Sequence, residues 1–126
     1  MVRDTAHRLA EYLSRRIGDG LRTVVIAADG GYELEYIRDD LSERYTERTL
    51  TAAVTDLQVE TSFSSPSSDS SPAGERRAVV YYYENAFVLR FPFSEAEQII
   101  ISIGTGVGTD LLRFIEDCRR IVDRSG

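Results

Sequence analysis

The chain has 126 residues, which suits one domain that buries roughly two thirds of its unfolded surface. Its basic residues are all arginine and it has more acidic than basic side chains, so the formal net charge is −6. The absence of lysine excludes Walker-type phosphate binding and Schiff-base catalysis, and the negative charge disfavours binding to nucleic acid. One histidine and one cysteine are too few for the usual zinc ligand sets.

The same composition indicates an environment. An acidic surface without lysine resembles that of halophilic archaeal proteins, although a GC-rich genome that favours arginine codons would also remove lysine. The first residues show no charged segment followed by an apolar leader, and no apolar run is long enough to span a bilayer. We therefore expect a cytoplasmic protein without membrane insertion.

The first predicted element is an amphipathic helix over residues 4–17. Asp4 is the expected N-cap, and the glycines of the sequence Gly18-Asp19-Gly20 are expected to end the helix. His7 lies beside the apolar stripe, so we expect a solvated surface histidine, with a pH-sensing or catalytic role as the alternative. The apolar stripe has helical spacing and consists of Ala6, Leu9, Ala10, Leu13 and Ile17.

A β-hairpin is predicted next. Residues 21–28 form a nearly continuous apolar run, which predicts a central strand covered on both faces. Asp29, Gly30 and Gly31 give a strong turn signal, and residues 32–37 alternate between apolar and acidic side chains. The second strand should therefore pack on one face and meet water on the other.

A charged connector at residues 38–45 leads to a second predicted helix at residues 47–60, with Thr46 as its N-cap. The apolar face of that helix consists of Leu50, Ala53, Val54 and Leu57. The connector and helix start hold four carboxylates that lack EF-hand spacing, so we expect an acidic surface and not a metal site. These carboxylates belong to Asp39, Asp40, Glu43 and Glu47.

Residues 61–75 are rich in serine and proline and predict a flexible loop. A plain spacer is the simplest interpretation of this loop. A segment that is phosphorylated, or ordered by a partner, is the alternative.

Three strands and a helix are predicted in the second half. The strands cover residues 77–83, 87–93 and 98–103, and Pro92 should face an edge or a bulge because it lacks an N–H group. The helix covers residues 110–123. Cys118 lies on its apolar stripe and is expected in the core, with a redox role as the alternative.

A glycine-rich connector lies between the last strand and the last helix. Its spacing is G-x-G-x-G and no strand follows the helix, so it differs from the dinucleotide-binding fingerprint. We expect Thr109 or Asp110 to cap the helix. The alternative is an anion or ligand site, because backbone amides in such turns bind phosphates. The candidate contacts are Gly104, Gly106, Gly108 and Thr109.

The element order α-ββ-α-βββ-α predicts an α+β fold in one domain of residues 1–126, with a five-stranded, mostly antiparallel sheet. The two apolar strands, residues 24–28 and 99–103, should be central neighbours. This arrangement resembles the roadblock/dynein light chain family, which is related to the longin and profilin-like folds. The residues that carry the resemblance are Gly20-Leu21 before Val24-Val25-Ile26, the Asp29-Gly30 turn and the unit at residues 98–122. The second half also resembles uncharacterised small haloarchaeal proteins.

The roadblock resemblance implies a non-catalytic homodimer, joined through the second helix and third strand, that binds or regulates a small Ras-like GTPase. The sequence supports part of this, because residues 79–83 are apolar or aromatic on both faces of a predicted edge strand and carry no protecting charges. The candidate interface residues are Leu50, Val54, Leu57, Val79, Val80, Tyr81, Tyr82 and Tyr83.

Two other functions stay open. The first is a small-molecule-sensing domain, with a pocket between the sheet and a helix near Tyr32, Tyr36 or the glycine connector. The second is an enzyme that uses carboxylates and tyrosines. We expect no catalytic site, cofactor, metal or nucleic-acid partner.

Overall fold

The computed structural model describes residues 1–28, 31–46, 48–54 and 72–125. In the first half it contains α1 (Val2–Ile17), the 3₁₀ helix η1 (Gly18–Gly20), β1 (Leu21–Ala28), β2 (Gly31–Ile37) and α2 (Asp39–Arg44). Residues 48–54 are also helical. In the second half it contains β3 (Val79–Tyr82), β4 (Ala86–Pro92), β5 (Glu97–Gly104), the 3₁₀ helix η3 (Thr105–Asp110) and α4 (Leu111–Ser125).

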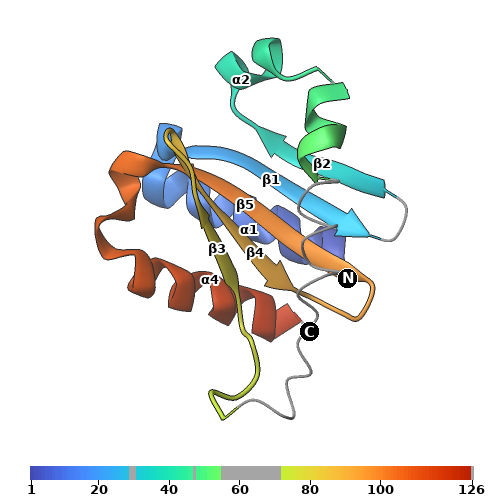
Figure 1. The fold of residues 1–126 in the computed structure, drawn as a ribbon, viewed down its shortest axis with the longest axis vertical. Coiled ribbons are helices and arrows are strands. Elements are labelled where there is room, and N and C mark those ends of the chain that lie inside the picture. The colour runs from blue at the N-terminus through green and yellow to red at the C-terminus, as the bar shows by residue number, and fades with distance from the viewer. Residues whose placement is uncertain (29–30, 47, 55–71, 126) are drawn as a thin grey trace.

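The five strands form one sheet in the order β2-β1-β5-β4-β3, and every pair of neighbours is antiparallel (Figure 1). The predicted α+β class and the predicted order of strands and helices are therefore confirmed. β1 and β5 are central neighbours, with Val24 opposite Ile101 and Ile26 opposite Ile99. Continuous apolar strands take the central positions because only there are both faces shielded from water.

The main core lies between one face of the sheet and the helices α1 and α4. Leu9 and Leu13 of α1 and Phe114 of α4 are buried in this cluster, together with Val24 and Ile101. Full burial of a side chain of this size contributes about 1.5–3 kcal/mol. The apolar stripes of α1 and α4 thus cover this face of the sheet.

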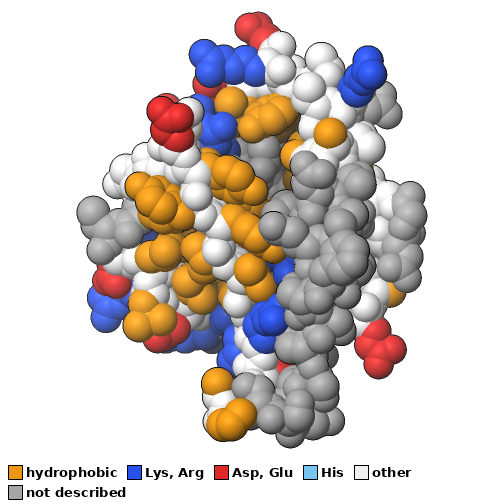
Figure 2. All heavy atoms as spheres, in the orientation of Figure 1, with side chains coloured by type: hydrophobic (Ala, Val, Ile, Leu, Met, Phe, Trp, Pro, Cys, Tyr) orange, Lys and Arg blue, Asp and Glu red, His pale blue; other side chains and the backbone are white. Residues whose placement is uncertain are grey.

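The opposite face carries a smaller cluster. Val25, Ala27 and Ile100 of the sheet are buried there with Val54, and Tyr81 is partly buried against them. Figure 2, in the orientation in which β1 and β5 lie in front of α1, shows hydrophobic side chains gathered over the sheet on this face. Both faces of β1 are buried because successive residues point to opposite sides.

Two local predictions in the first half were wrong. Helix α1 begins at Val2 and not at Asp4, because the N-cap position is Met1, whose carbonyl accepts hydrogen bonds from the backbone N–H and the hydroxyl of Thr5. The charged connector at residues 38–45 contains α2. This helix is anchored by Leu41, which is buried, so one apolar side chain suffices to hold a polar segment against the fold.

Other local predictions were confirmed. Gly18 has a φ of +54°, as expected for a glycine that ends a helix. Thr46 caps the next helix: its hydroxyl accepts from the N–H of Thr49 at 3.2 Å, and its own N–H donates to the Thr49 hydroxyl at 2.9 Å. That helix is seen at residues 48–54, while the rest of the predicted range and most of the serine-rich loop lie outside the described residues.

Candidate functional site

The outer edge of β3 is the first candidate site. β3 ends the sheet, and its residues Val79–Tyr82 pair with β4 from Val79 opposite Arg90 to Tyr82 opposite Phe87. The N–H of Tyr83 donates to the carbonyl of Ala86 at 2.8 Å. Because Tyr83 is a hydrogen-bonded position, it determines which residues of β3 bond to β4 and which do not. In an antiparallel pair only every second residue bonds to its partner strand. The backbone groups of the two intervening residues, Val80 and Tyr82, therefore point away from the sheet.

The side chains along this edge are apolar and partly exposed. Val80 is 39% exposed and Tyr82 is 76% exposed, and the Tyr82 ring stacks on Phe87 with 4.9 Å between ring centroids. On the other face the Arg90 guanidinium lies 5.7 Å from the centroid of the Tyr81 ring. The strand is thus held firmly by β4, and no charged residue lies within it to protect its edge.

The helical interface candidates do not lie on this edge. Leu50 is half-buried and lines a hollow beside β2, at the opposite end of the sheet from β3. Val54 is buried against Val25 and Ile100, and Leu57 lies outside the described residues. The structure therefore brings Val79–Tyr82 and Tyr83 together, but not with Leu50.

The glycine connector packs against η1. Residues 105–110 form η3, which runs directly into α4 at Leu111. A Cβ atom placed on Gly20 would lie 2.7 Å from Cγ2 of Val107, so Gly20 permits the close approach of the two 3₁₀ helices. Gly104 ends β5 opposite Ala86, and Gly106 is exposed. Gly108 and Thr109, the other candidate anion contacts, also lie in η3.

A second candidate site, called here the β2 hollow, has a volume of about 710 Å³. It lies between β2, α2 and residues 48–54, and its lining includes the rings of Tyr32 and Tyr45 and the apolar side chains of Leu34 and Leu50. The hydroxyl of Thr51 donates to the Tyr32 hydroxyl at 3.3 Å. This hollow is where the ligand-sensing hypothesis expects a pocket near Tyr32.

Tyr36, the other tyrosine of that hypothesis, lines a separate groove against α1. His7 lines the same groove, with Nε2 2.7 Å from Glu11 and Nδ1 2.9 Å from Glu35. The hydrogen bond with Glu35, followed by the charge of Glu11, raises the pKa of His7 above its ordinary value. His7 is exposed, as expected, and it ties α1 to β2.

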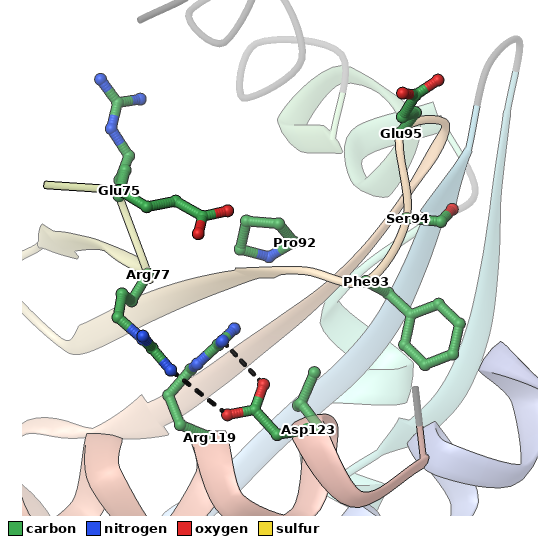
Figure 3. Close-up of a pocket in the computed structure, with 10 residues that line it drawn as sticks. Glu75, Arg77, Pro92, Phe93, Ser94, Glu95, Arg119 and Asp123 are labelled. Carbon is green, nitrogen blue, oxygen red and sulfur yellow. Dashed lines mark hydrogen bonds and ion pairs between the residues drawn. The ribbon is translucent and has the colours of Figure 1, made fainter. Parts of the chain in front are cut away.

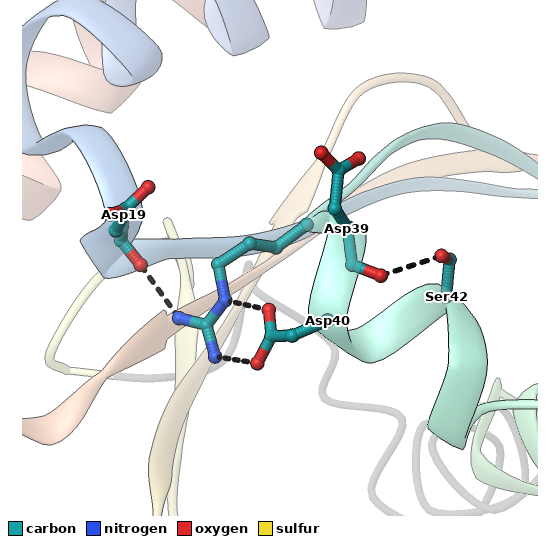
Figure 4. Close-up of polar contacts among 5 residues, drawn as sticks. Asp19, Asp39, Asp40 and Ser42 are labelled. Atoms are coloured by element: carbon teal, nitrogen blue, oxygen red, sulfur yellow. Dashed lines mark hydrogen bonds and ion pairs between the residues drawn. The ribbon is translucent and has the colours of Figure 1, made fainter.

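Asp39 and Asp40, which belong to the predicted acidic surface, are not arranged as a metal site. Figure 4 shows Asp40 held by Arg38, whose Nε and Nη2 donate to the two carboxylate oxygens at 2.5 and 3.0 Å, while Nη1 donates to the Asp19 carbonyl at 2.6 Å. The hydrogen bond with Arg38 lowers the pKa of Asp40. The Ser42 hydroxyl donates to the carbonyl of Asp39 at 2.7 Å. Within the described part of the chain, no group of three or more His, Cys, Asp or Glu side chains could hold a metal ion.

Cys118 is fully buried in the main core. Burial raises the pKa of its thiol to about 12, so the thiolate needed for redox chemistry is disfavoured at neutral pH. The predicted core position is therefore confirmed.

One further hollow was missed by sequence reasoning. It is lined by Arg77, Pro92, Phe93, Arg119 and Asp123, among others (Figure 3). These residues come from three separate parts of the chain, and none belongs to a recognisable motif. No sequence signal could have placed them together, because their proximity depends on the packing of α4 beside the end of β4.

The fold and these surfaces define a small α+β protein with an antiparallel five-stranded sheet, an apolar edge strand and hollows that include those beside β2 and α4. Residues 7–123 match the family described as "Domain of unknown function (DUF7522)", so the chain belongs to this family. No protein with a curated description matches the chain. Across the residues that the structure describes, every helix is too short or too polar to cross a membrane.

Proposed function

We propose that this protein is a non-catalytic interaction module that forms a homodimer through β3. The observation that carries the proposal is the outer edge of β3, where the backbone groups of Val80 and Tyr82 point outward from an uncharged, partly exposed strand. Such an edge is a ready template for pairing with another strand. A second copy of the same edge offers a self-complementary partner across a two-fold axis.

The geometry of this edge sets the size of the effect. In an antiparallel pair of two β3 strands with Val80 opposite Tyr82 of the other copy, these two residues supply four inter-chain hydrogen bonds. At about 1 kcal/mol each, the four bonds contribute about 4 kcal/mol. Burial of the exposed Tyr82 ring adds apolar contact area. Association also costs several kcal/mol in lost freedom, so we expect a dimer at micromolar concentration and not a picomolar one.

Light scattering coupled to size-exclusion chromatography tests the dimer. The expected mass is twice the 14.2 kDa of the monomer at micromolar concentration. Val80→Pro removes an outward N–H that takes no part in the pairing of β3 with β4, so it leaves the β3–β4 ladder intact. Across two copies it removes two of the four bonds, about 2 kcal/mol, which corresponds to roughly a thirtyfold weaker dimer.

The second variant is Tyr82→Lys, which places a charge at the β3 edge. Leu34→Lys is its matched control, because Leu34 is an exposed apolar residue on β2, at the opposite edge of the sheet. We expect Tyr82→Lys to give monomers and Leu34→Lys to leave the dimer unchanged. A monomeric wild type at micromolar concentration would refute the proposal. Equal effects of the two lysine variants on the dimer would refute it as well.

The roadblock resemblance adds a partner to this proposal. The element order and the position of the third strand at the sheet edge support the resemblance, which implies that the dimer binds or regulates a small Ras-like GTPase. The test is titration of the purified dimer with a Ras-like GTPase from the same organism, in its GDP and GTP-analogue forms. Saturable binding supports the GTPase role. Absence of binding removes the GTPase role while leaving the dimer intact.

The environment is also part of the proposal: a cytoplasmic protein of a halophilic archaeon. Its support is the lysine-free composition with a net charge of −6. Salt screens repulsion among like charges at the surface, so we expect the free energy of unfolding to rise from low to molar KCl. A protein of maximal stability in dilute buffer would contradict the halophilic assignment.

Ligand sensing is the second candidate function, favoured by the β2 hollow. Its volume and its mixture of tyrosine rings, aliphatic side chains and hydroxyl groups suit a small organic molecule. Thermal-shift screening of nucleotides and metabolites tests it, since a ligand at a hundred times its Kd stabilises by about 2.7 kcal/mol. A hit must lose its shift in Leu50→Lys, which places a charge in the hollow, for the assignment to hold.

A further inference from the structure

The hollow missed by sequence reasoning, called here the arginine hollow, has a volume of about 440 Å³. It lies between the segment that leads into β3, the turn from β4 to β5 and the last turns of α4 (Figure 3). Pro92, Phe93 and Val122 provide apolar lining. Arg77 and Arg119 stand side by side at its wall, and both guanidinium groups contact the Asp123 carboxylate.

The two guanidinium groups share one carboxylate. Nη2 of Arg119 donates to Oδ1 of Asp123 at 2.7 Å, and Nη2 of Arg77 donates to Oδ2 at 3.4 Å, which is long for such a bond. One negative charge thus faces two positive charges. Nε of Arg119 is buried and has no hydrogen-bond partner in the described part of the chain. An unpaired buried N–H is unfavourable, so this guanidinium has hydrogen-bonding capacity that Asp123 does not use.

We propose that the arginine hollow binds a small carboxylate with an apolar body. The carboxylate lies against Arg77 and Arg119, whose planar groups suit two-oxygen recognition, and the body lies on Pro92, Phe93 and Val122.

The other charges of the hollow favour a ligand with a single negative charge. Glu75, Arg76 and Glu95 also line the hollow, so its three arginines are balanced by three carboxylates. Without a net positive charge, the hollow favours a singly charged carboxylate over the doubly charged form of phosphate. In Figure 3 the Glu75 carboxylate points toward Pro92, while Glu95 lies on the turn from β4 to β5. Glu75 can therefore also pair with the ammonium group of an amino acid, which is one of two sources of the same carboxylate chemistry.

Titration of the full ¹⁵N-labelled chain, followed by NMR, tests the proposal with three probes: 3-phenylpropionate, L-phenylalanine and inorganic phosphate. We expect saturable shifts of the Arg77, Arg119 and Asp123 amides with at least one of the two carboxylates, and weaker binding of phosphate. Tighter binding of phenylalanine identifies an amino acid as the ligand class, and tighter binding of phenylpropionate identifies a plain organic acid. Absence of saturable shifts at millimolar carboxylate overturns the proposal, and so does phosphate as the tightest ligand.

Four variants separate a ligand site from a surface ion pair. Arg77→Gln and Arg119→Gln should each weaken binding by about tenfold or more, because each removes a charge-assisted hydrogen bond. Arg113→Gln makes the same change on the exposed surface of α4 and should leave binding unchanged. Asp123→Asn should strengthen binding, because it removes the internal competitor for both arginines.

Fold loss cannot mask the result, because Arg77 is largely exposed and its variant keeps the core intact. Equal affinity of the wild type and the Arg77→Gln variant would overturn the proposal. Weaker binding in Asp123→Asn would also overturn it, since that result would mean that Asp123 contacts the ligand or orients the arginines instead of competing for them.

Discussion

Gly20 and Val107 provide a sharp test of how the glycine connector is held. A Cβ on Gly20 would lie 2.7 Å from Cγ2 of Val107, which is shorter than the van der Waals contact distance of two carbon atoms. It would lie 3.5 Å from Cβ of Ile17, which is an ordinary contact. Val107 is half-buried and β-branched, so rotation of its side chain out of the way is restricted. Gly20→Ala must therefore displace η3 from η1.

The magnitude follows from two opposing effects. Overpacking costs about 1–3 kcal/mol, and replacement of glycine at an ordinary φ returns about 0.4–1 kcal/mol by restricting the unfolded chain. We expect Gly20→Ala to lower the free energy of unfolding by about 1–2 kcal/mol. With an unfolding entropy of about 2.1 cal/mol/K per residue, this corresponds to a Tm lower by about 4–8 °C.

A double-mutant cycle isolates the contact. Val107→Ala alone should cost about 1 kcal/mol through lost burial. In the Val107→Ala background the space is open, so Gly20→Ala should be neutral or stabilising, which gives a coupling energy of about 2 kcal/mol. Urea unfolding of the four proteins measures it. If Gly20→Ala costs the same in both backgrounds to within about 0.5 kcal/mol, the packing of η1 on η3 is refuted.

Two further predictions concern titratable groups. The folded-state pKa of His7 is raised, so its pairing with Glu11 and Glu35 stabilises the fold fully below the unfolded pKa, near 6.5, and this contribution is lost as pH rises through the folded value. Urea unfolding at pH 5.5 and 8.5 should show this loss in the wild type and not in His7→Gln, and an identical pH dependence of both would contradict it. The buried Cys118 thiol, with a pKa of about 12, should react with a disulfide reagent only as fast as the protein opens, so labelling should be slow in buffer and rapid in denaturant. Rapid labelling of the folded protein would show that the thiol is accessible.

Local patterns predicted most of the fold. Continuous apolar character located β1 with the correct ends and placed it beside β5, because few positions in a sheet shield both faces of a strand. Thr46 was identified as a cap because capping depends on residues only three positions apart. The errors at Asp4 and in residues 38–45 have the opposite cause. The Met1 carbonyl, which accepts from Thr5, starts α1 earlier, and the buried Leu41 holds a helix where the local sequence is polar.

For the candidate sites too, the local sequence determined some features and the tertiary structure determined the others. The sequence alone determined that residues 79–82 form an uncharged strand, since composition and alternation are properties of neighbouring residues. Only the tertiary structure decided that the backbone of Val80 and Tyr82 points outward, because the hydrogen-bond alternation is set by pairing with β4. It alone brought Arg77 to Arg119, 42 positions apart, since such proximity depends on how α4 packs against the sheet and not on any local pattern.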